Sequence, residues 1–440
     1  MTDRNDQSRP YPVPAGRVAR LARLGSMATG VAGAMLADGA MHLGRGQRPA
    51  LRDLLLTPSN AARIADQLAQ MRGAAMKVGQ LMSLDAGDMM PPELSDILAR
   101  LRADARPMPA QQLKSVLTQN WGAGWHTKFR RFDTRPLAAA SIGQVHRAVT
   151  RDGRDLAIKV QYPGVARSID SDVDNVGALI RLSGLAPRGL DLGPFLQAAK
   201  AQLHEETDYL REGRELATFG NLLSGEDGFE VPEFFEDLST GTLLAMRYVE
   251  GGAIEDLAGA SQTLRNDVAA RMIRLSAREL FEFGRMQTDP NFANYQYNAD
   301  LDRIVLLDFG ATRSFGPEIV ETYRALLRAG LEEDRDRLRK AALDLGAFDV
   351  ATAPHHQNAI IDMIMMGFDA VGPDGVFNFA NRELQEALQS AGMELAQDKS
   401  LTHVPPPETL FLQRKLGGMY LLCARLGASV NIRAILRPYL

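Results

Sequence analysis

The sequence predicts an α+β protein with two lobes and a helical extension in front of them. Apolar residues recur at helical spacing between residues 57 and 120, and strand-like runs with tight turns begin near residue 129. After Gly252 the pattern is helical again, apart from one loop and one buried strand. We therefore expect a disordered tail at 1–15, a helical extension at 16–128, a smaller lobe at 129–251 and a larger helical lobe at 252–440.

The composition excludes several kinds of site. Of the 440 residues 45% are hydrophobic and 24% charged, as in ordinary folded proteins, and the net charge of −4 gives no footprint for nucleic acid. Cys423 is the only cysteine, which excludes an internal disulfide and a thiolate zinc site. The adjacent His355 and His356 lie in a polar stretch without helical metal spacing, so we interpret them as solvated.

The start of the extension is the part nearest to a membrane-interacting segment. No apolar run reaches the length of about 18 residues that a membrane span needs. Residues 25–44 come closest, but they are mostly Ala, Gly and Met and include Asp38. We interpret residues 16–44 as a helix, which either lies on a membrane surface, pairs with another helix through small residues, or packs on its own protein.

The remaining helices and strands are predicted from the spacing of apolar residues and from the positions of prolines. An apolar helical face is formed by Leu68, Met71, Ala75, Val78 and Met82. Pro91 begins a second helix and Pro107 precedes a third. We expect strands around Val145 and at 156–160, helices over 165–225, strands at 230–234 and 243–249, a loop near 288–300 and a strand at 304–307.

The triplet Asp308-Phe309-Gly310 is the first motif that indicates a chemical function. It follows the buried run at 304–307, which delivers an aspartate to a turn. A carboxylate presented in this way can bind the Mg²⁺ ion that bridges ATP phosphates. For the triplet alone, an ordinary turn at the end of a strand is the plainer interpretation.

Asp289 and Asn294 strengthen the nucleotide interpretation. They are five positions apart, as are the catalytic-loop Asp and Asn of protein kinases. In that role Asp289 accepts a hydroxyl proton or orients a nucleophile, and Asn294 holds the second metal ion. An Asp-Pro pair is often only a turn, but a turn does not account for a second motif at Asp308.

Lys159 and Glu212 are candidates for the ion pair of such a site. Lys159 is flanked by apolar residues in a strand, so its ammonium must reach water or find a carboxylate. In a kinase-like protein this lysine contacts the α- and β-phosphates and pairs with a helix glutamate, here Glu212. A solvated acidic helix face is the alternative for Glu212.

The segment from Met246 to Val249 suits a hinge whose backbone binds the adenine edge.

Two features depart from the ordinary protein-kinase pattern. The Gly-rich loop before Lys159 is replaced by an alanine-rich segment, whose backbone amides can still form an anion nest although its alanines crowd the loop. We expect this segment to contact the nucleotide through Ala138, Ala139, Ala140, Ser141, Ile142, Gly143 and Gln144. After Gly310 a helix begins near Glu318, which leaves almost no room for the activation segment on which a peptide substrate docks.

In these motifs and departures the sequence resembles the UbiB family of atypical kinase-like proteins over residues 57–330. The resemblance is carried by Lys77-Val78-Gly79-Gln80, the alanine-rich segment, Lys159, Glu206 and Asp208 with Glu212, Asp289 to Asn294, and Asp308 to Gly310. The stretch from Gln287 to Asn294 is closer to the mitochondrial-type ubiquinone-biosynthesis members.

The resemblance implies a protein-kinase-like two-lobed fold whose helical extension packs over the active site. In that arrangement Lys77 pairs with Glu206 and Asp208, and the element that includes Gly79 and Gln80 occludes the site. The apolar face around Lys77 agrees with this expectation, because a buried lysine needs a carboxylate.

The resemblance also implies a function. We expect a kinase-like ATPase that uses ATP and Mg²⁺ to support ubiquinone biosynthesis by acting on lipid intermediates or the biosynthetic enzymes. Its expected partners are a membrane surface and ubiquinone precursors or enzymes, without nucleic acid, and a homodimer is left open. The expected location is the bacterial cytoplasm at the inner membrane, or the mitochondrial matrix side in a eukaryote.

Two other functions stay open at this point. A protein kinase acting in trans needs an accessible peptide groove, which the short segment after Gly310 disfavours. A non-catalytic lipid-binding scaffold that uses nucleotide only as a switch has no need of every metal-binding carboxylate, and the sequence retains them.

Overall fold

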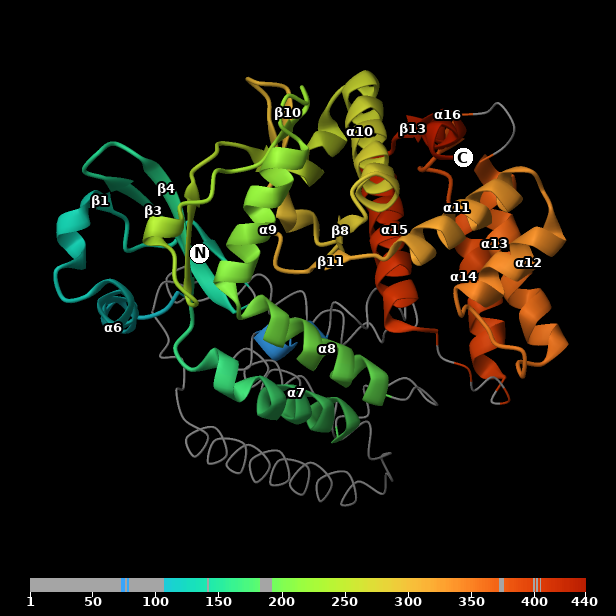
Figure 1. The fold of residues 1–440 in the computed structure, drawn as a ribbon, viewed down its shortest axis with the longest axis horizontal. Helices are drawn as coiled ribbons and strands as arrows, with labels where there is room; N and C mark the ends of the chain where they lie inside the picture. The colour runs from blue at the N-terminus through green and yellow to red at the C-terminus, as the bar shows by residue number, and fades with distance from the viewer. Residues whose placement is uncertain are drawn as a thin grey trace, which may run out of the picture. The chain divides into compact units, whose positions relative to one another are not determined.

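The computed structural model divides into two compact units, which Figure 1 shows as a ribbon. It describes residues 73–75, 77–78, 107–140, 142–182, 192–371, 376–398, 400, 403 and 405–440. The expected tail at 1–15, the helix at 16–44, and the residues Gly79, Gln80 and Ser141 lie outside these described residues. Unit 1 comprises Met1–Arg214 and Glu233–Val249, and unit 2 comprises Glu215–Pro232 and Glu250–Leu440.

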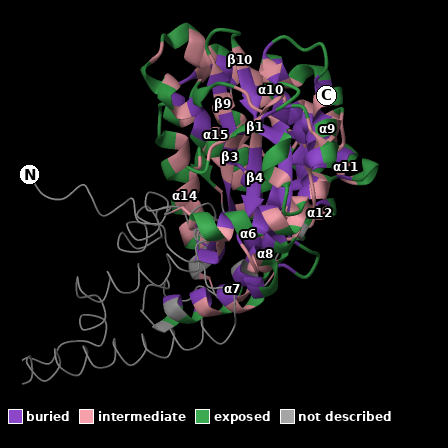
Figure 2. Cartoon of the chain, turned by 90° about the vertical axis from the view of Figure 1, so that its left-hand side faces the viewer, coloured by how far each residue is buried: buried purple, intermediate pink, exposed green. Residues whose placement is uncertain are grey.

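Unit 1 is built on an antiparallel sheet in the order β1-β3-β4-β6, with β2 paired to β3. Its strands are β1 Phe129–Phe132, β2 Ala138–Ala139, β3 Gly143–Thr150, β4 Asp155–Gln161 and β6 Leu243–Arg247. Figure 2 colours most of β4 as buried, because it lies between β3 and β6 and is covered on its faces. The sheet therefore offers a rigid, dry platform for side chains on β4.

One face of this sheet packs against helix α6, Ala110–Trp121. Leu113, Val116 and Leu117 recur at spacings of three and four and form the buried face of the helix. They join Ile158 and Val160 of β4 in one hydrophobic core. This core holds the alternate residues of β4 in place, and Lys159 between them points to the other face.

Three longer helices complete unit 1 and lead out of it. They are α7 Val165–Leu182, α8 Gly193–Glu206 and α9 Tyr209–Leu222. Helices α7 and α8 lie side by side in Figure 1 and contact each other. Within the described part of 165–225 these helices confirm the helical prediction, and α9 continues past Arg214 into the part of the chain that belongs to unit 2.

Unit 2 contains a mixed sheet in the order β5-β10-β9-β7 and a separate pair, β11 with β8. Its strands are β5 Phe229–Glu230, β7 Gly252–Ala253, β8 Arg285–Gln287, β9 Tyr295–Asn298, β10 Arg303–Leu306 and β11 Thr312–Ser314. Because β8 pairs with β11 and β9 with β10, the segments 288–294 and 307–311 are brought together.

The strands β8 and β11 were not expected after Gly252, and two predicted segments need correction. The run at 230–234 is not one strand beside 243–249: β5 pairs in parallel with β10 of unit 2, and only an isolated bridge from Phe234 reaches Met246. Pro232 explains the break, since proline cannot donate to a sheet ladder. The segment 288–300, predicted to be a loop, contains strand β9. Polar residues in this strand make its alternation of buried and partly buried positions hard to recognise in the sequence.

Helices make up the rest of unit 2. They are α10 Gln262–Phe281, α11 Pro317–Leu331, α12 Arg335–Asp344, α13 Pro354–Val371, α14 Glu383–Gln397, α15 Pro407–Leu426 and α16 Ile432–Leu436. Helices α11 to α14 form one group in Figure 1, and α10 contacts α15. None of the helices that the structure describes combines the length and apolarity that a membrane crossing requires.

Short elements connect these parts. The 3₁₀ helices are η2 Trp125–Lys128, η3 Glu236–Leu238, η4 Ile254–Gly259, η5 Phe292–Asn294 and η6 Arg437–Tyr439. A small strand pair joins β12, Phe377–Asn378, to β13, Ser429–Val430.

A buried ion pair fixes both ends of the segment 288–294. Lys415 of α15 lies 3.3 Å from the Glu279 carboxylate of α10, and both side chains are almost fully buried. Glu279 Oε1 accepts a hydrogen bond from the Gln287 amide at 3.2 Å, and Lys415 Nζ donates to the Tyr295 hydroxyl at 3.0 Å. Gln287 precedes the segment and Tyr295 follows it, so one charged cluster holds the residues on both sides.

The pKa directions in this cluster have clear causes. Burial raises the pKa of the Glu279 carboxyl, and Lys415 only partly opposes this effect. Burial also disfavours the charged form of Lys415, but the attraction of Glu279 and the contact with Tyr295 outweigh it and raise the pKa of this lysine. Lys415 is therefore charged, and its charged form depends on the Glu279 carboxylate.

Breaking this pair from one side will destabilise unit 2. We expect Lys415→Met to cost about 3–5 kcal/mol, because it leaves Glu279 buried without its cation. Adding Glu279→Gln removes the stranded charge and should recover at least half of that loss. Calorimetric thermal unfolding of both variants tests this expectation, and additive losses in the double variant would contradict it.

Two neighbouring glycines of α15 provide a matched test of how the segment packs. A Cβ on Gly418 would lie 2.0 Å from the Pro290 Cβ, whereas a Cβ on Gly417 meets nothing within 4 Å. Gly417→Ala should stabilise by roughly 0.5–1 kcal/mol through helix propensity. Gly418→Ala should destabilise, because overpacking costs about 1–3 kcal/mol and exceeds that gain. Thermal midpoints that shift in the same direction for both variants would refute close packing of α15 on Pro290.

Candidate nucleotide-binding site

The lysine–glutamate pair predicted for unit 1 is formed. Lys159 Nζ donates to both carboxylate oxygens of Glu212, at 2.9 and 3.1 Å. The exposed fractions of the two side chains are 9% and 2%, so the pair is shielded from water. The Tyr209 ring, one turn earlier on α9, lies 5.3 Å from the same ammonium and adds a cation–π contact.

Local structure explains why these two side chains meet. Lys159 is opposite Val145 of β3 and Leu244 of β6, so its backbone is fixed on both sides. Glu212 lies in the first turn of α9, where the helix dipole favours a negative charge. A sheet and a helix start therefore hold the lysine and the carboxylate against each other in a buried position.

A second lysine pair lies in the same unit. Lys77 Nζ is 2.6 Å from Glu206 Oε1, and the lysine side chain is only 1% exposed. Asp208 behaves differently from the expectation that it shares this pair: its Oδ1 accepts a hydrogen bond from the Arg211 amide at the start of α9. The structure thus assigns Glu206 to Lys77 and gives Asp208 a contact at the helix start.

The alanine-rich segment forms a tight hairpin. Ala138 and Ala139 pair with Val145 and Gln144, and the Ala140 amide donates to the Gly143 carbonyl at 2.9 Å. A Cβ on Gly143 would lie 2.4 Å from the carbonyl oxygen of Val160, which explains the glycine at this position.

Two side chains of this hairpin are used inside the unit. Ile142 is buried, and Gln144 Oε1 accepts from the Met108 amide at 2.8 Å while its amide nitrogen contacts His146. Contacts with phosphate from these two residues would therefore come from their backbone amides and not from their side chains. Met246 is likewise buried in β6, and Val249 is half-buried at the point where the chain passes to unit 2.

In unit 2 the structure brings Asp289, Asn294 and the Asp308 turn together. Asn294 Nδ2 donates to the Asp289 carbonyl at 3.4 Å, which closes the segment on itself. The Leu307 amide donates to the Asn294 carbonyl at 3.0 Å. Thr288 is bound to the Ala311 carbonyl through both its amide and its hydroxyl, at 3.2 and 2.8 Å. The two segments are thus linked at both ends.

The Asp308-Phe309-Gly310 turn is anchored by its middle residue. Phe309 is 1% exposed and its ring lies 4.7 Å from that of Phe219 in the second half of α9. The same stretch of α9 is tied to β8 by Glu215 and Arg285, with contacts of 2.6 and 2.7 Å. Asp308 itself is half-buried, and its Oδ1 accepts from the Gly310 amide at 3.0 Å.

These residues fit a magnesium ion. Asp308 supplies a carboxylate and Asn294 an amide oxygen, and hard oxygen donors are the ligands that Mg²⁺ prefers. The Asn294 amide nitrogen is already used on the Asp289 carbonyl, which leaves the oxygen as the ligand atom. Such a set keeps few protein ligands on the ion, as is usual when phosphates complete the coordination.

The residues that support this segment are not apparent from the sequence motifs. Lys415, Glu279, Tyr295 and Gly418 do not belong to any of the motifs. One signal was available: Lys415 is spaced three positions after the buried Leu412 and four before the buried Met419. A lysine in an apolar helix face indicates burial and pairing, although no local pattern identifies its partner.

Comparisons with known proteins agree with this geometry. A family model described as the ABC1 atypical kinase-like domain matches residues 100–342. The mitochondrial atypical kinase COQ8 of Saccharomyces cerevisiae is 38% identical over 98% of this chain and 86% of that protein. The mitochondrial atypical kinase COQ8B of Rattus norvegicus is also 38% identical, over 98% of this chain and 81% of that protein.

A solved structure shares the fold. The structure of Rv3197 from Mycobacterium tuberculosis, a complex with erythromycin, has a TM-score of 0.60 and 22% sequence identity. The match covers 85% of this chain and 93% of that one. With the α+β architecture, the lysine–glutamate pair and the linked Asp289 and Asp308 segments, these matches show that the chain belongs to the ABC1/UbiB family of atypical kinase-like proteins and is an enzyme of the kinase or ATPase type.

Proposed function

We propose that this protein binds Mg-ATP and uses it to support ubiquinone biosynthesis, acting on lipid intermediates or on the biosynthetic enzymes at a membrane. The observation that carries the nucleotide part is the buried pair of Lys159 and Glu212. A buried ammonium costs free energy unless a carboxylate holds it, and this one is held on the central strand of a sheet. Contact with α- and β-phosphates is the use that kinase-like proteins make of such a lysine.

The proposal gives each residue of unit 2 a separate task. Asp308 and Asn294 hold Mg²⁺, which when bound neutralises charge on the β- and γ-phosphates. Asp289 orients the attacking hydroxyl or water and accepts its proton. Lys415, Glu279 and Gly418 keep this segment in position, because they fix the residues next to it and the place of Pro290.

The substrate is proposed to be small or lipid-like. Directly after Gly310 the chain enters β11, which is committed to pairing with β8, and α11 begins at Pro317. A peptide substrate needs a free segment here on which to dock, and the described chain has little of it. This observation favours ATP hydrolysis or transfer to a small molecule over phosphorylation of proteins in trans.

The ubiquinone and membrane parts rest on the family resemblance and on the similarity to the two mitochondrial atypical kinases. We propose a peripheral location at the inner membrane on the cytoplasmic side, or the matrix side in a mitochondrion. The partners proposed are the membrane surface and ubiquinone precursors or enzymes, and a homodimer stays open. Lys77 and Glu206, with Gly79 and Gln80, are proposed to restrict access to the nucleotide.

Nucleotide binding should be visible as stabilisation. We expect Mg-ATP at about 100 times its Kd to stabilise the wild type by roughly 2.7 kcal/mol. Asp308→Asn should abolish most of the resulting rise in Tm, because the carboxylate for Mg²⁺ is lost. Asp300→Asn is the matched control, since Asp300 is exposed in the turn between β9 and β10. An unchanged wild-type Tm, or equal shifts in all three proteins, would contradict the proposal.

Chemistry can be separated from binding at Asp289. We expect Asp289→Asn to keep the Mg-ATP-induced rise in Tm but to lose about 10²–10⁴ in ATPase rate, the usual contribution of a general base. The assay compares ATP turnover with and without liposomes and quinone-like phenols, and stimulation by both supports a membrane-bound substrate.

Two outcomes would favour the other functions. Robust phosphate transfer to soluble proteins would establish a kinase acting in trans. Full rescue of a ubiquinone-deficient deletion strain by Asp289→Asn would establish a nucleotide-switched scaffold.

A further inference from the structure

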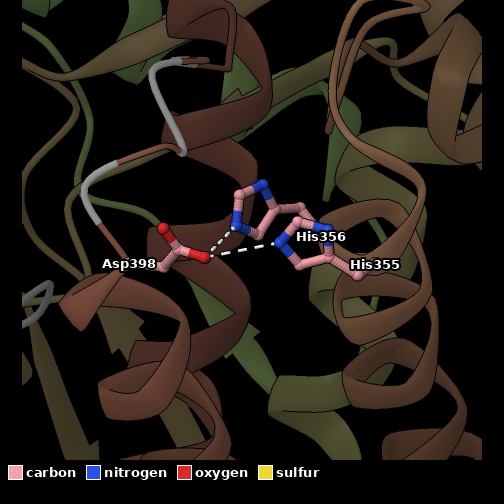
Figure 3. Close-up of side chains that lie close together, drawn as sticks. All are labelled: His355, His356 and Asp398. Carbon is pink, nitrogen blue, oxygen red and sulfur yellow. Dashed lines mark hydrogen bonds and ion pairs between the residues drawn. The ribbon is translucent and has the colours of Figure 1, made fainter.

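A cluster of two histidines and one aspartate lies in unit 2 and includes none of the residues assigned above. Figure 3 shows His355 and His356 directing their rings toward Asp398. The Nε2 atoms of the two histidines are 3.4 and 2.8 Å from the same carboxylate oxygen, Asp398 Oδ2. The three side chains each offer one ligand atom, and these atoms lie within 4.8 Å of one another.

The interpretation of the histidine pair as solvated holds for His355, which is exposed, and is wrong for His356. His355 and His356 belong to the first turn of α13, and the side chain of His356 is only 3% exposed. Their ring centroids are 3.9 Å apart, although the two residues are adjacent in the sequence. Adjacent positions on a helix do not face one direction, so the convergence depends on side-chain rotamers and on Asp398 at the end of α14.

The aspartate is itself held in position. Asp398 is the C-cap residue that follows α14, and its Oδ1 accepts from the amide and the hydroxyl of Ser400, at 2.9 and 2.7 Å. This leaves Oδ2 directed at the two imidazoles. Carboxylates that bind metals are commonly oriented by such hydrogen bonds to their other oxygen.

Hydrogen bonding alone is the simpler explanation, and the geometry can be weighed against it. One imidazole donating to Asp398 would satisfy the carboxylate, as His204 does with Asp170 elsewhere in the chain at 3.0 Å. Here a second imidazole approaches the same oxygen, so that two ring nitrogens and one carboxylate oxygen lie within 4.8 Å of one another. This donor set is the one that transition-metal sites in proteins use.

The donor set and spacing match a borderline divalent ion. Ligand atoms bound tetrahedrally to Zn²⁺ at roughly 2.0–2.1 Å lie about 3.3 Å apart. Two of the three separations, 2.8 and 3.4 Å from Asp398 Oδ2, bracket that value, and the third is no more than 4.8 Å. Two imidazoles with one carboxylate suit Zn²⁺ and similar transition ions, whereas Mg²⁺ and Ca²⁺ prefer oxygen donors alone.

We propose that His355 Nε2, His356 Nε2 and Asp398 Oδ2 form a binding site for Zn²⁺ or a closely related divalent transition ion. The ion joins the first turn of α13 to the end of α14, two helices that already pack together. Three protein ligands leave one coordination position for water or another donor. The site is separate from the Mg²⁺ ligands Asp308 and Asn294 in both residues and donor chemistry.

Zinc titration of the full-length, chelator-treated protein tests the site. Zn²⁺ is added in competition with a chromophoric chelator, and its stoichiometry and Kd are compared among variants. We expect His355→Gln and Asp398→Asn to weaken one equivalent of Zn²⁺ at least tenfold, since even residues behind the ligands change metal affinity by about 10–100-fold. His204→Gln removes a lone histidine–aspartate contact of the same kind and should leave the affinity unchanged.

A second readout keeps the test independent of folding. Zn²⁺ should raise the Tm of the wild type and not that of His355→Gln, whose exposed side chain is not part of the core. A hundredfold excess of Mg²⁺ should not displace the ion. The proposal is overturned if the wild type binds no such equivalent of Zn²⁺, or if His355→Gln binds it with the wild-type Kd.

Discussion

Burial of a lysine ammonium is the constraint on which the described structure depends most. Removing such a charge from water costs several kcal/mol unless a carboxylate meets it in good geometry. Among the described residues, Lys77, Lys159 and Lys415 are each less than a tenth exposed, and each meets a carboxylate. The partners come from α8, α9 and α10, so each pair fixes a helix against another part of its own unit.

Strand pairing fixes the positions of the two segments of unit 2, as the ion pair with Glu212 fixes the side chain of Lys159. The segments that contain Asp289 and Asp308 have little regular structure of their own. Each is flanked by strands, and because β8 pairs with β11 and β9 with β10, both segments enter and leave at fixed points. The two strand pairs therefore set how the segments that carry Asp289 and Asp308 lie beside each other.

Much of the site was predictable from the sequence because its parts are local. The Asp308 turn follows a strand, Asp289 and Asn294 share a short segment, and Lys159 is conspicuous within an apolar run. What could not be predicted depends on contacts distant in sequence: Glu279 with Lys415, or His356 with Asp398. The β5 strand was misplaced for a related reason, since Pro232 ends it and its partner β10 lies far along the chain. Local pattern identifies a buried charge but does not select its partner.

The ion pair of Lys415 and Glu279 fixes the positions of neighbouring residues as well as balancing charge. An apolar cluster of similar volume would be about as stable or more stable, so stability alone does not account for the pair. Hydrogen bonds have fixed geometry, however, and this pair makes one to the Gln287 amide and one to the Tyr295 hydroxyl. Packed methyl groups would leave the residues beside Asp289 and Asn294 free to shift, whereas these hydrogen bonds fix their positions. We infer that positional precision next to Asp289 and Asn294 is what the buried charges contribute.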